Sequence, residues 1–182
     1  MKVVDTDIPD VKLIEPKVFA DDRGFFFESW RENAMAEYGI AGPWVQDNHS
    51  RSAKGVLRGI HYQVQQPQGK LVRVTSGAVL DVAVDLRQSS PTFGKHVAFE
   101  LSAENKHMLW VPPGFGHAFL TLEDDTDFLY KCTDYFAPEH DRSIRWDDPD
   151  IGINWPLAPG ETPDVSDKDA KGKWFKDAEL YP

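Results

Sequence analysis

From residue 80 onward, apolar side chains recur at every second position along four segments of the chain. The segments cover residues 80–87, 97–101, 118–122 and 128–132. Successive side chains of a β-strand point to opposite faces, so this period of two indicates strands with one buried face. Runs rich in Gly, Pro, Ser and Asp separate the segments. Many short strands at regular spacing predict a mainly β fold, either a jelly-roll barrel or a β-sandwich.

A helical period is found in only two places. Trp30, Ala34 and Tyr38 recur at helical spacing after a capping box that begins at Ser29, and Gly39 is a plausible end. A second, short helix is expected over residues 166–180, capped by Ser166 or Asp167. No linker, repeat or low-complexity segment interrupts the chain. The pattern therefore predicts one domain, residues 1–182, with a few short helices at its periphery.

Composition and charge exclude several classes of function. The chain has 182 residues and a formal net charge of −10, whereas a nucleic-acid-binding protein needs a basic face. The single cysteine, Cys132, rules out an internal disulfide and disfavours a thiolate zinc site. No apolar run approaches the roughly 18 residues that span a bilayer, and the first residues lack a signal-peptide core. We expect a cytoplasmic protein that binds neither nucleic acid nor membrane.

One stretch departs from this acidic average. No Asp or Glu occurs between Asp47 and Asp81, although the chain has 30 acidic residues. The same window contains five cations and two histidines: Arg51, Lys54, Arg58, Lys70, Arg73, His49 and His61. A locally positive segment attracts an anion, and a histidine beside it can move protons near neutral pH. The window therefore predicts an anion site with acid–base chemistry.

His61 and Lys70 are the candidates within this window, and each has a structural alternative. His61 is either a hydrogen-bonded structural histidine or a general base. Strand alternation places Lys70 on the same face as Val72, with Leu71 and Arg73 on the other face. A lysine on an inward face is costly unless it meets an anion, whereas on an edge strand it is an ordinary surface residue.

His117 ends the sequence PPGFGH, a P-x-G-x-x-H pattern that is similar to the second motif of the cupin superfamily. In metal-binding cupins the first motif supplies two histidines and a glutamate. At that place this chain has His61-Tyr62-Gln63, with Lys70 further on. One imidazole and the carboxylate are missing, and a cation stands nearby. If the fold is a cupin-type barrel, the sequence predicts a metal-free site.

Tyr130 lies in the alternating segment 128–132 and shares a face with Phe128 and Cys132. The default interpretation is a core tyrosine with a satisfied hydroxyl. If that face lines the pocket, the hydroxyl is instead a candidate proton donor.

Together these motifs resemble the dTDP-4-dehydrorhamnose 3,5-epimerase family of cupin-fold enzymes. The likeness is carried by DRGFFFE at 22–28, VLRGIH at 56–61 and QGKLVR at 68–73. Five further segments extend it over nearly the whole chain: 15–19, 45–50, 91–94, 128–131 and 166–169. The family inverts C3 and C5 of a dTDP-linked 4-keto-6-deoxyhexose. Both carbons are α to the C4 ketone, so a base, an opposed acid and a cation near O4 suffice.

The resemblance also implies residue roles. His61 corresponds to the base, Asp169 to its orienting carboxylate, Tyr130 to the acid and Lys70 to the stabiliser of the enolate oxygen. The positions that resemble substrate contacts are Arg23, Glu28, Gln46, Asp47, Asn48, Arg58, His117, Asp141 and Lys168. Phe136 corresponds to the aromatic that stacks on thymine, with Tyr135 and Phe19 as further candidates. The family pattern often has glutamate where Asp141 stands. The resemblance implies a homodimer and neither cofactor nor metal.

Three alternatives remain open at this point. A relative could invert only C3 or only C5, because one base and one acid suit all three reactions. A metal-dependent cupin oxygenase is disfavoured by the missing histidine. A non-catalytic cupin that only binds sugar nucleotides would show the same cations and aromatics.

Overall fold

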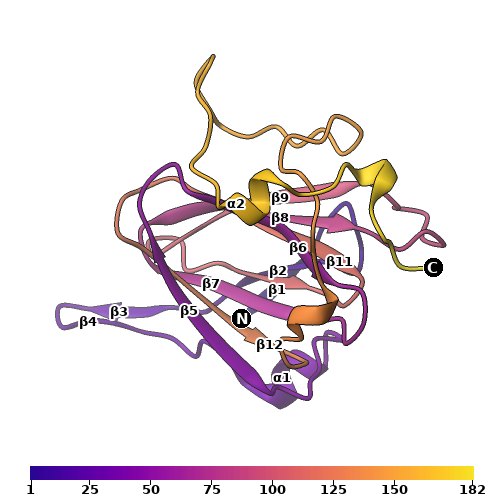
Figure 1. Cartoon of the computed structure of the whole chain (residues 1–182). Coiled ribbons are helices and arrows are strands. Elements are labelled where there is room, and N and C mark those ends of the chain that lie inside the picture. Colours follow the sequence, from indigo (N-terminus) through magenta and orange to yellow (C-terminus); the bar gives the residue numbers. More distant parts are fainter.

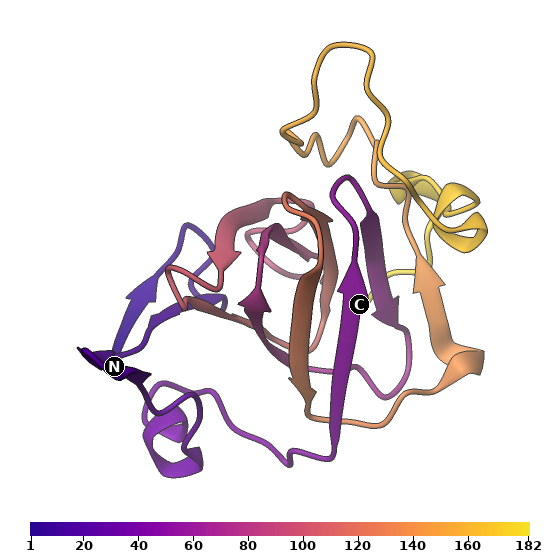
Figure 2. The same cartoon turned by 90° about the vertical axis from the view of Figure 1, so that its left-hand side faces the viewer.

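The computed structural model describes all 182 residues as two facing antiparallel sheets. The first sheet has six strands, in the order β1 (Lys2–Asp5), β2 (Lys12–Glu15), β10 (Met108–Val111), β7 (Lys70–Ser76), β12 (Thr126–Cys132), β5 (Gln46–Ser52). The second has five strands, in the order β13 (Asp141–Ser143), β6 (Leu57–Gln63), β11 (Phe115–Thr121), β8 (Ala78–Asp85), β9 (His96–Ser102). The mainly β prediction is confirmed, and the sheets form a sandwich rather than a closed barrel (Figures 1 and 2).

The main core lies between the two sheets. Val72 and Phe128 from the six-stranded sheet meet Ala83 and Phe119 from the five-stranded sheet, and all four are almost fully buried. Branched and aromatic side chains fill such a layer well, and each contributes about 1.5–3 kcal/mol on burial. The predicted inward face of β7, with Lys70 in line with Val72, is the face that meets this core.

The strands β8 and β11 are buried on both faces, so the expectation of half-buried strands is wrong for them. Val79 and Ala83 point between the sheets, whereas Val82 and Val84 belong to a second apolar cluster on the outer side. Residues 144–181 cover that side, with Trp155 buried in the cluster. Figure 2 shows this segment, orange to yellow, along one side of the sandwich. Alternation of an apolar with a small or polar residue therefore does not mark a solvent face here.

A third cluster covers the outer face of the six-stranded sheet, where the helix α1 (Glu32–Ala36) packs. The helix is shorter than predicted, and its N-cap is Arg31, without a side-chain cap. Trp30 precedes the helix and packs edge-on against Trp44, beside the third cluster. The capping box at Ser29 is therefore wrong.

The C-terminal helix is also shorter than predicted. α2 (Asp167–Ala170) is capped by Ser166, whose Oγ accepts the N–H of Asp169, as expected. It ends early because Lys173 forms a parallel bridge with Ile144. Gly172 lies between α2 and Lys173, and a side chain at that position would meet the backbone of Ile144 at 2.9 Å. Two 3₁₀ helices, Pro138–His140 and Phe175–Asp177, complete the short helices.

The hairpin of β3 (Phe19–Asp21) and β4 (Gly24–Phe26) forms a sheet of its own and projects from the sandwich (Figure 1). Its strands are exposed along their whole length. None of the helices is long and apolar enough to cross a membrane.

Candidate active site

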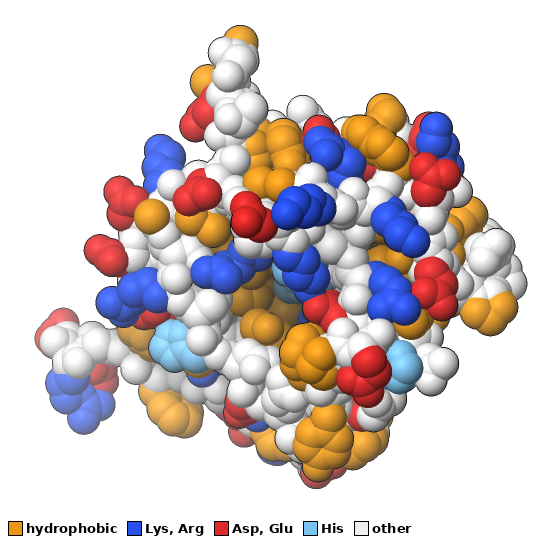
Figure 3. Space-filling view, in the orientation of Figure 1, with side chains coloured by type: hydrophobic (Ala, Val, Ile, Leu, Met, Phe, Trp, Pro, Cys, Tyr) orange, Lys and Arg blue, Asp and Glu red, His pale blue; other side chains and the backbone are white.

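A pocket of about 160 Å³ opens between the two sheets beside α2. Its lining includes six of the residues singled out in the sequence: His61, Lys70, Tyr130, Phe136, Asp141 and Lys168. Five more complete it: Tyr62, Gln63, Gln68, Phe115 and Tyr181. Figure 3 shows Lys and Arg side chains gathered around a central hollow with apolar atoms in its depth. The pocket combines a cationic rim with apolar atoms in its depth.

His61, on β6, is paired with a carboxylate that comes from α2, more than 100 residues later. Its Nε2 lies 2.5 Å from Oδ1 of Asp169, which is only 2% exposed. A carboxylate at this nitrogen fixes the tautomer and stabilises an imidazolium, leaving Nδ1 free. Gly59 makes the geometry possible, because its φ is +125° and a Cβ there would meet Ala118 on β11 at 2.5 Å. The pair is therefore built to accept a proton.

Asp169 is held by three further groups. The backbone N–H of Gly59 and the hydroxyl of Ser143 donate to its carboxylate at 3.4 and 3.3 Å. The hydroxyl oxygen of Ser166 accepts the backbone N–H of Asp169. Burial alone would raise the pKa of Asp169, but its hydrogen bond to His61, the charge of that histidine and the Gly59 N–H hold the pKa below its usual value. The residue is thus an anion at neutral pH.

Lys70 enters the pocket from β7, in the opposite sheet. The residue is partly accessible, but its ammonium lies deep among protein atoms and makes no hydrogen bond or ion pair. Burial lowers the pKa of Lys70, while Cys132, Asp141 and Asp81 act in the other direction. A buried cation without a partner is costly, so the site favours an anionic ligand atom near Nζ.

Tyr130 lies on β12, next to Lys70, whose Nζ is 6.0 Å from the centre of the tyrosine ring. Burial, helped by Cys132 and Asp141, raises the pKa of Tyr130, and Arg58 acts against this. The hydroxyl therefore keeps its proton near neutral pH. His61 and Tyr130 stand on opposite sheets, so a flat ligand between them meets the imidazole from one side and the phenol from the other.

The loop 133–137 borders the pocket through Phe136, and three glutamines hold this loop. Gln46 accepts the N–H of Phe136 at 2.9 Å, Gln63 contacts the backbone of Tyr135 and Ala137, and Gln68 donates to the carbonyl of Asp134. Tyr135 and Phe136 are 60% and 52% exposed. Exposed aromatic rings on a fixed loop can stack on a planar group.

The remaining polar candidates near the pocket bond to one another. Lys168 forms an ion pair with Asp141, and Arg58 donates to the hydroxyl of Ser52 at 3.1 and 3.2 Å. Asn48, which accepts from the Gln46 amide, contacts the buried thiol of Cys132. The Lys168 side chain remains 48% exposed and Arg58 bonds only a neutral hydroxyl, so both cations are available to an anionic ligand.

Four predicted site residues lie elsewhere in this chain. Phe19 and Arg23 are on the projecting hairpin, where Arg23 pairs with Asp21 at 2.5 Å, and Glu28 pairs with Arg31. Asp47 points to the outer face of the six-stranded sheet. There it pairs with Lys131 and lines a second hollow of about 310 Å³. The single chain does not bring these four together with His61.

Sequence reasoning missed one buried carboxylate. His117, on β11, is directly opposite His61 on β6 and is 6% exposed, and its Nε2 lies 2.9 and 3.0 Å from the two oxygens of Asp81. Asp81 lies on the inward face of β8, between Val79 and Ala83. An aspartate inside an alternating apolar strand was the available signal. No group of three or more His, Cys, Asp or Glu side chains is arranged to hold a metal ion.

Comparison with known proteins gives a consistent result. The family model described as dTDP-4-dehydrorhamnose 3,5-epimerase matches residues 5–177. A relative from Pseudomonas aeruginosa with the same description is 57% identical over 183 residues and covers the full length of both chains. A relative from Shigella flexneri is 51% identical, again over all of this chain and 99% of its own.

Solved structures agree with the sequence relatives. The epimerase from Legionella pneumophila, in complex with dTDP-4-keto-L-rhamnose, superposes with a TM-score of 0.95 at 50% identity, over 99% of this chain and 97% of its own. A 3'-monoepimerase from Streptomyces bikiniensis, in complex with dTDP-quinovose, has a TM-score of 0.87 at 35% identity, over 94% and 87%. The chain belongs to the dTDP-4-dehydrorhamnose 3,5-epimerase family of isomerases.

Proposed function

We propose that this chain epimerises dTDP-4-dehydro-6-deoxy-D-glucose at C3 and C5, giving dTDP-4-dehydro-L-rhamnose for dTDP-L-rhamnose biosynthesis. The observation that best supports this is a single pocket in which the His61–Asp169 pair stands across from Lys70 and Tyr130. The family match supplies the substrate class, and the geometry supplies a place for each step of proton transfer.

His61 removes the proton at C5 or C3, because each C–H lies α to the C4 ketone. The proton moves to Nδ1, since Nε2 is already bonded to Asp169, and the anionic carboxylate stabilises the imidazolium that forms. Tyr130 then donates its proton to the carbanion carbon from the opposite side, which inverts the centre. Solvent exchange restores both groups before the second carbon reacts.

Lys70 stabilises the enolate between these two transfers. The electron pair of the broken C–H bond moves to O4, which becomes negative, and the ammonium of Lys70 has no other anion bonded to it. A preorganised cation in a water-poor site stabilises this charge far more than water does. The site therefore needs no cofactor in this mechanism.

The nucleotide lies along the rim. Arg58 and Lys168 are cations next to the pocket, suited to the pyrophosphate, and Phe136 or Tyr135 stacks on the thymine. Asp141 lines the pocket, Gln46 bonds the backbone of Phe136 beside it, and Asn48 contacts Cys132 on the strand of Tyr130. His117, directly opposite His61, is the remaining candidate for a substrate contact.

A homodimer is part of this proposal. Phe19, Phe25 and Phe26 are 54%, 61% and 69% exposed on the projecting hairpin, and clustered exposed aromatics favour a protein partner. In a symmetric pair the hairpin carries Phe19 and Arg23 to the site of the partner subunit, and the sheet face around Asp47 becomes internal. Sedimentation of the wild-type chain and of Phe26→Ser measures this, and a monomeric wild type contradicts it. We place the enzyme in the cytoplasm, where dTDP-sugars are made.

Incubation with dTDP-4-keto-6-deoxyglucose in D₂O tests the reaction. Deuterium at both C3 and C5, together with the L-rhamno product, is expected. Deuterium at one carbon only identifies a 3-only or 5-only epimerase, as the similarity to the 3'-monoepimerase allows. Binding of dTDP without exchange indicates a non-catalytic sugar-nucleotide-binding cupin, and stoichiometric iron in the purified protein revives the oxygenase alternative.

A further inference from the structure

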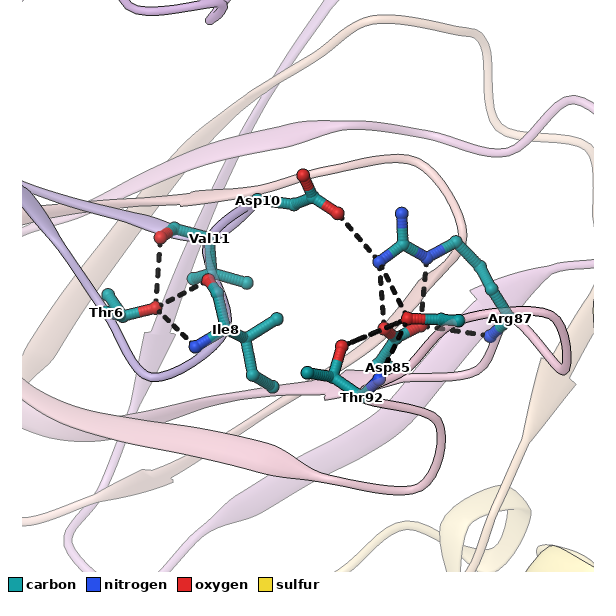
Figure 4. Close-up of polar contacts among 8 residues, drawn as sticks. Thr6, Ile8, Asp10, Val11, Asp85, Arg87 and Thr92 are labelled. Atoms are coloured by element: carbon teal, nitrogen blue, oxygen red, sulfur yellow. Dashed lines mark hydrogen bonds and ion pairs between the residues drawn. The ribbon is translucent and has the colours of Figure 1, made fainter.

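Two buried aspartates on β8, Asp81 and Asp85, share the inward face of one strand but have very different surroundings. Asp85 accepts from the guanidinium and N–H of Arg87 and from the hydroxyls of Ser90 and Thr92, at 2.6–3.1 Å. Figure 4 shows this cluster, with Asp10 of the N-terminal turn pairing to Arg87 from the other side. Asp85 is a fully partnered anchor for a loop.

Asp81 lacks such a set. Both of its oxygens approach the same nitrogen, Nε2 of His117, and no other donor reaches it. Its side chain is fully buried, and its partners across the neighbouring strands are Phe99 and Phe119. An ionised carboxylate accepts about four hydrogen bonds, so one donor in an apolar setting leaves it poorly satisfied. Folding stability alone does not account for an aspartate here.

The imidazole of His117 is held in turn by aromatic rings. Phe128 stacks on it with centres 6.0 Å apart, and Phe119 lies at 6.4 Å. His117 is the residue directly opposite His61 in the β6–β11 pairing. Burial lowers the pKa of Lys70 on the facing sheet, and the negative charge of Asp81 is one of the influences that oppose this. Asp81 thus contacts His117 and influences Lys70, two residues that the proposed function uses.

We propose that Asp81 is a positioning residue of the reaction: it fixes the orientation and tautomer of His117, the residue directly opposite His61 in the β6–β11 pairing. A carboxylate at Nε2 requires the proton on that nitrogen, so Nδ1 of His117 is the atom presented to the ligand. The structure therefore holds two His–Asp pairs, one for proton abstraction and one for holding the substrate. This inference rests on the proposed epimerase activity.

Asp81→Asn and the matched control Asp85→Asn test the proposal. Asp81→Asn is expected to lower kcat/KM by about 10- to 100-fold, by analogy with the loss on replacing a carboxylate that orients a metal-bound histidine. Its melting temperature should stay the same or rise, because a poorly partnered buried charge is removed. Asp85→Asn should do the opposite, melting several degrees lower with turnover within twofold of wild type.

The pH profile separates positioning from a general structural role. The groups near the Lys70 ammonium are Cys132, Asp141, Asp81 and Lys168, with the Tyr130 ring beside it. Removing Asp81 removes one influence that keeps the pKa of Lys70 from falling further. The alkaline limb of kcat/KM should therefore move to lower pH in Asp81→Asn and stay unchanged in Asp85→Asn.

The ¹⁵N spectrum of labelled histidine adds a readout that does not depend on turnover. Wild-type His117 should carry its proton on Nε2, and Asp81→Asn should show a mixture of tautomers. An unchanged tautomer, or turnover of Asp81→Asn within twofold of an active wild type, would overturn the proposal. An inactive wild type would instead contradict the epimerase function, and the tautomer would still decide whether Asp81 positions His117.

Discussion

The pocket and the cluster at the end of β8 are both built on buried charge, but they handle it in opposite ways. Around Asp85, every oxygen is matched by a donor and the guanidinium of Arg87 is shared between Asp85 and Asp10. In the pocket, the ammonium of Lys70 has no partner and Nδ1 of His61 is free. Charged groups whose hydrogen-bonding capacity is filled hold a loop in place, whereas charged groups without partners are available to bind a ligand. The difference marks which cluster carries chemistry.

The largest expected effect is the loss of the base. His61→Ala should lower kcat by about 10³- to 10⁴-fold, at the upper end of what a positioned general base contributes. Binding of dTDP should persist, because His61 does not hold the nucleotide. Single-turnover kinetics and calorimetric titration of dTDP measure the two properties separately. Near-normal turnover would break the assignment and with it the contrast between the clusters.

Replacement of the unpartnered cation comes next. Lys70→Met keeps the length of the side chain and removes its charge, so kcat should fall about 10²- to 10³-fold as the enolate loses its stabiliser. The melting temperature should not fall, because Lys70 makes no ion pair in the ligand-free protein. A strongly destabilised Lys70→Met with normal kcat would mean that Lys70 is structural, like Arg87.

Asp85→Asn should have the smallest effect on activity but a clear effect on stability, about 2 kcal/mol at pH 7, because each unit by which a carboxyl pKa is lowered in the folded protein is worth about 1.4 kcal/mol. Although burial opposes it, bonding to Arg87, Ser90 and Thr92 lowers the pKa of Asp85 to about 2. The unfolded chain titrates near 3.9, so this stabilisation is complete above about pH 5 and is lost as pH falls towards 2. Urea unfolding of both proteins between pH 7 and pH 2 measures it. A gap that does not narrow at low pH would count against the ionised carboxylate as its source.

The sequence predicted those strands whose own residues show an apolar period of two. The segments that became β9 and β12 alternate visibly and have their expected places, whereas β5, with the sequence QDNHSRS, has no apolar period. It is an edge strand held by pairing with β12. The inward face of β8 could not be assigned, because both faces are covered and the outer cover comes from Ile144 onward, some 60 residues away.

The site shows the same limit. His61, Lys70 and Tyr130 could be named from motifs, and the structure brings them to one pocket. The pairing of Asp81 with His117 depends on the registers of two sheet neighbours, which no motif records. The role of Phe19 and Arg23 depends on a second chain in our proposal, so no property of a single chain places them near the pocket.

The covering of β8 by residues 144–181 also sets an order of events during synthesis. A ribosome releases His61, Lys70 and Tyr130 long before Asp169, so the base emerges without the carboxylate that orients it. Until that late segment docks, the outer apolar side of the five-stranded sheet, including Leu57, Val82 and Leu120, faces water. Docking of residues 144–181 therefore covers this apolar surface and brings Asp169 to His61 in the same step. A nascent chain cannot acquire the second without the first.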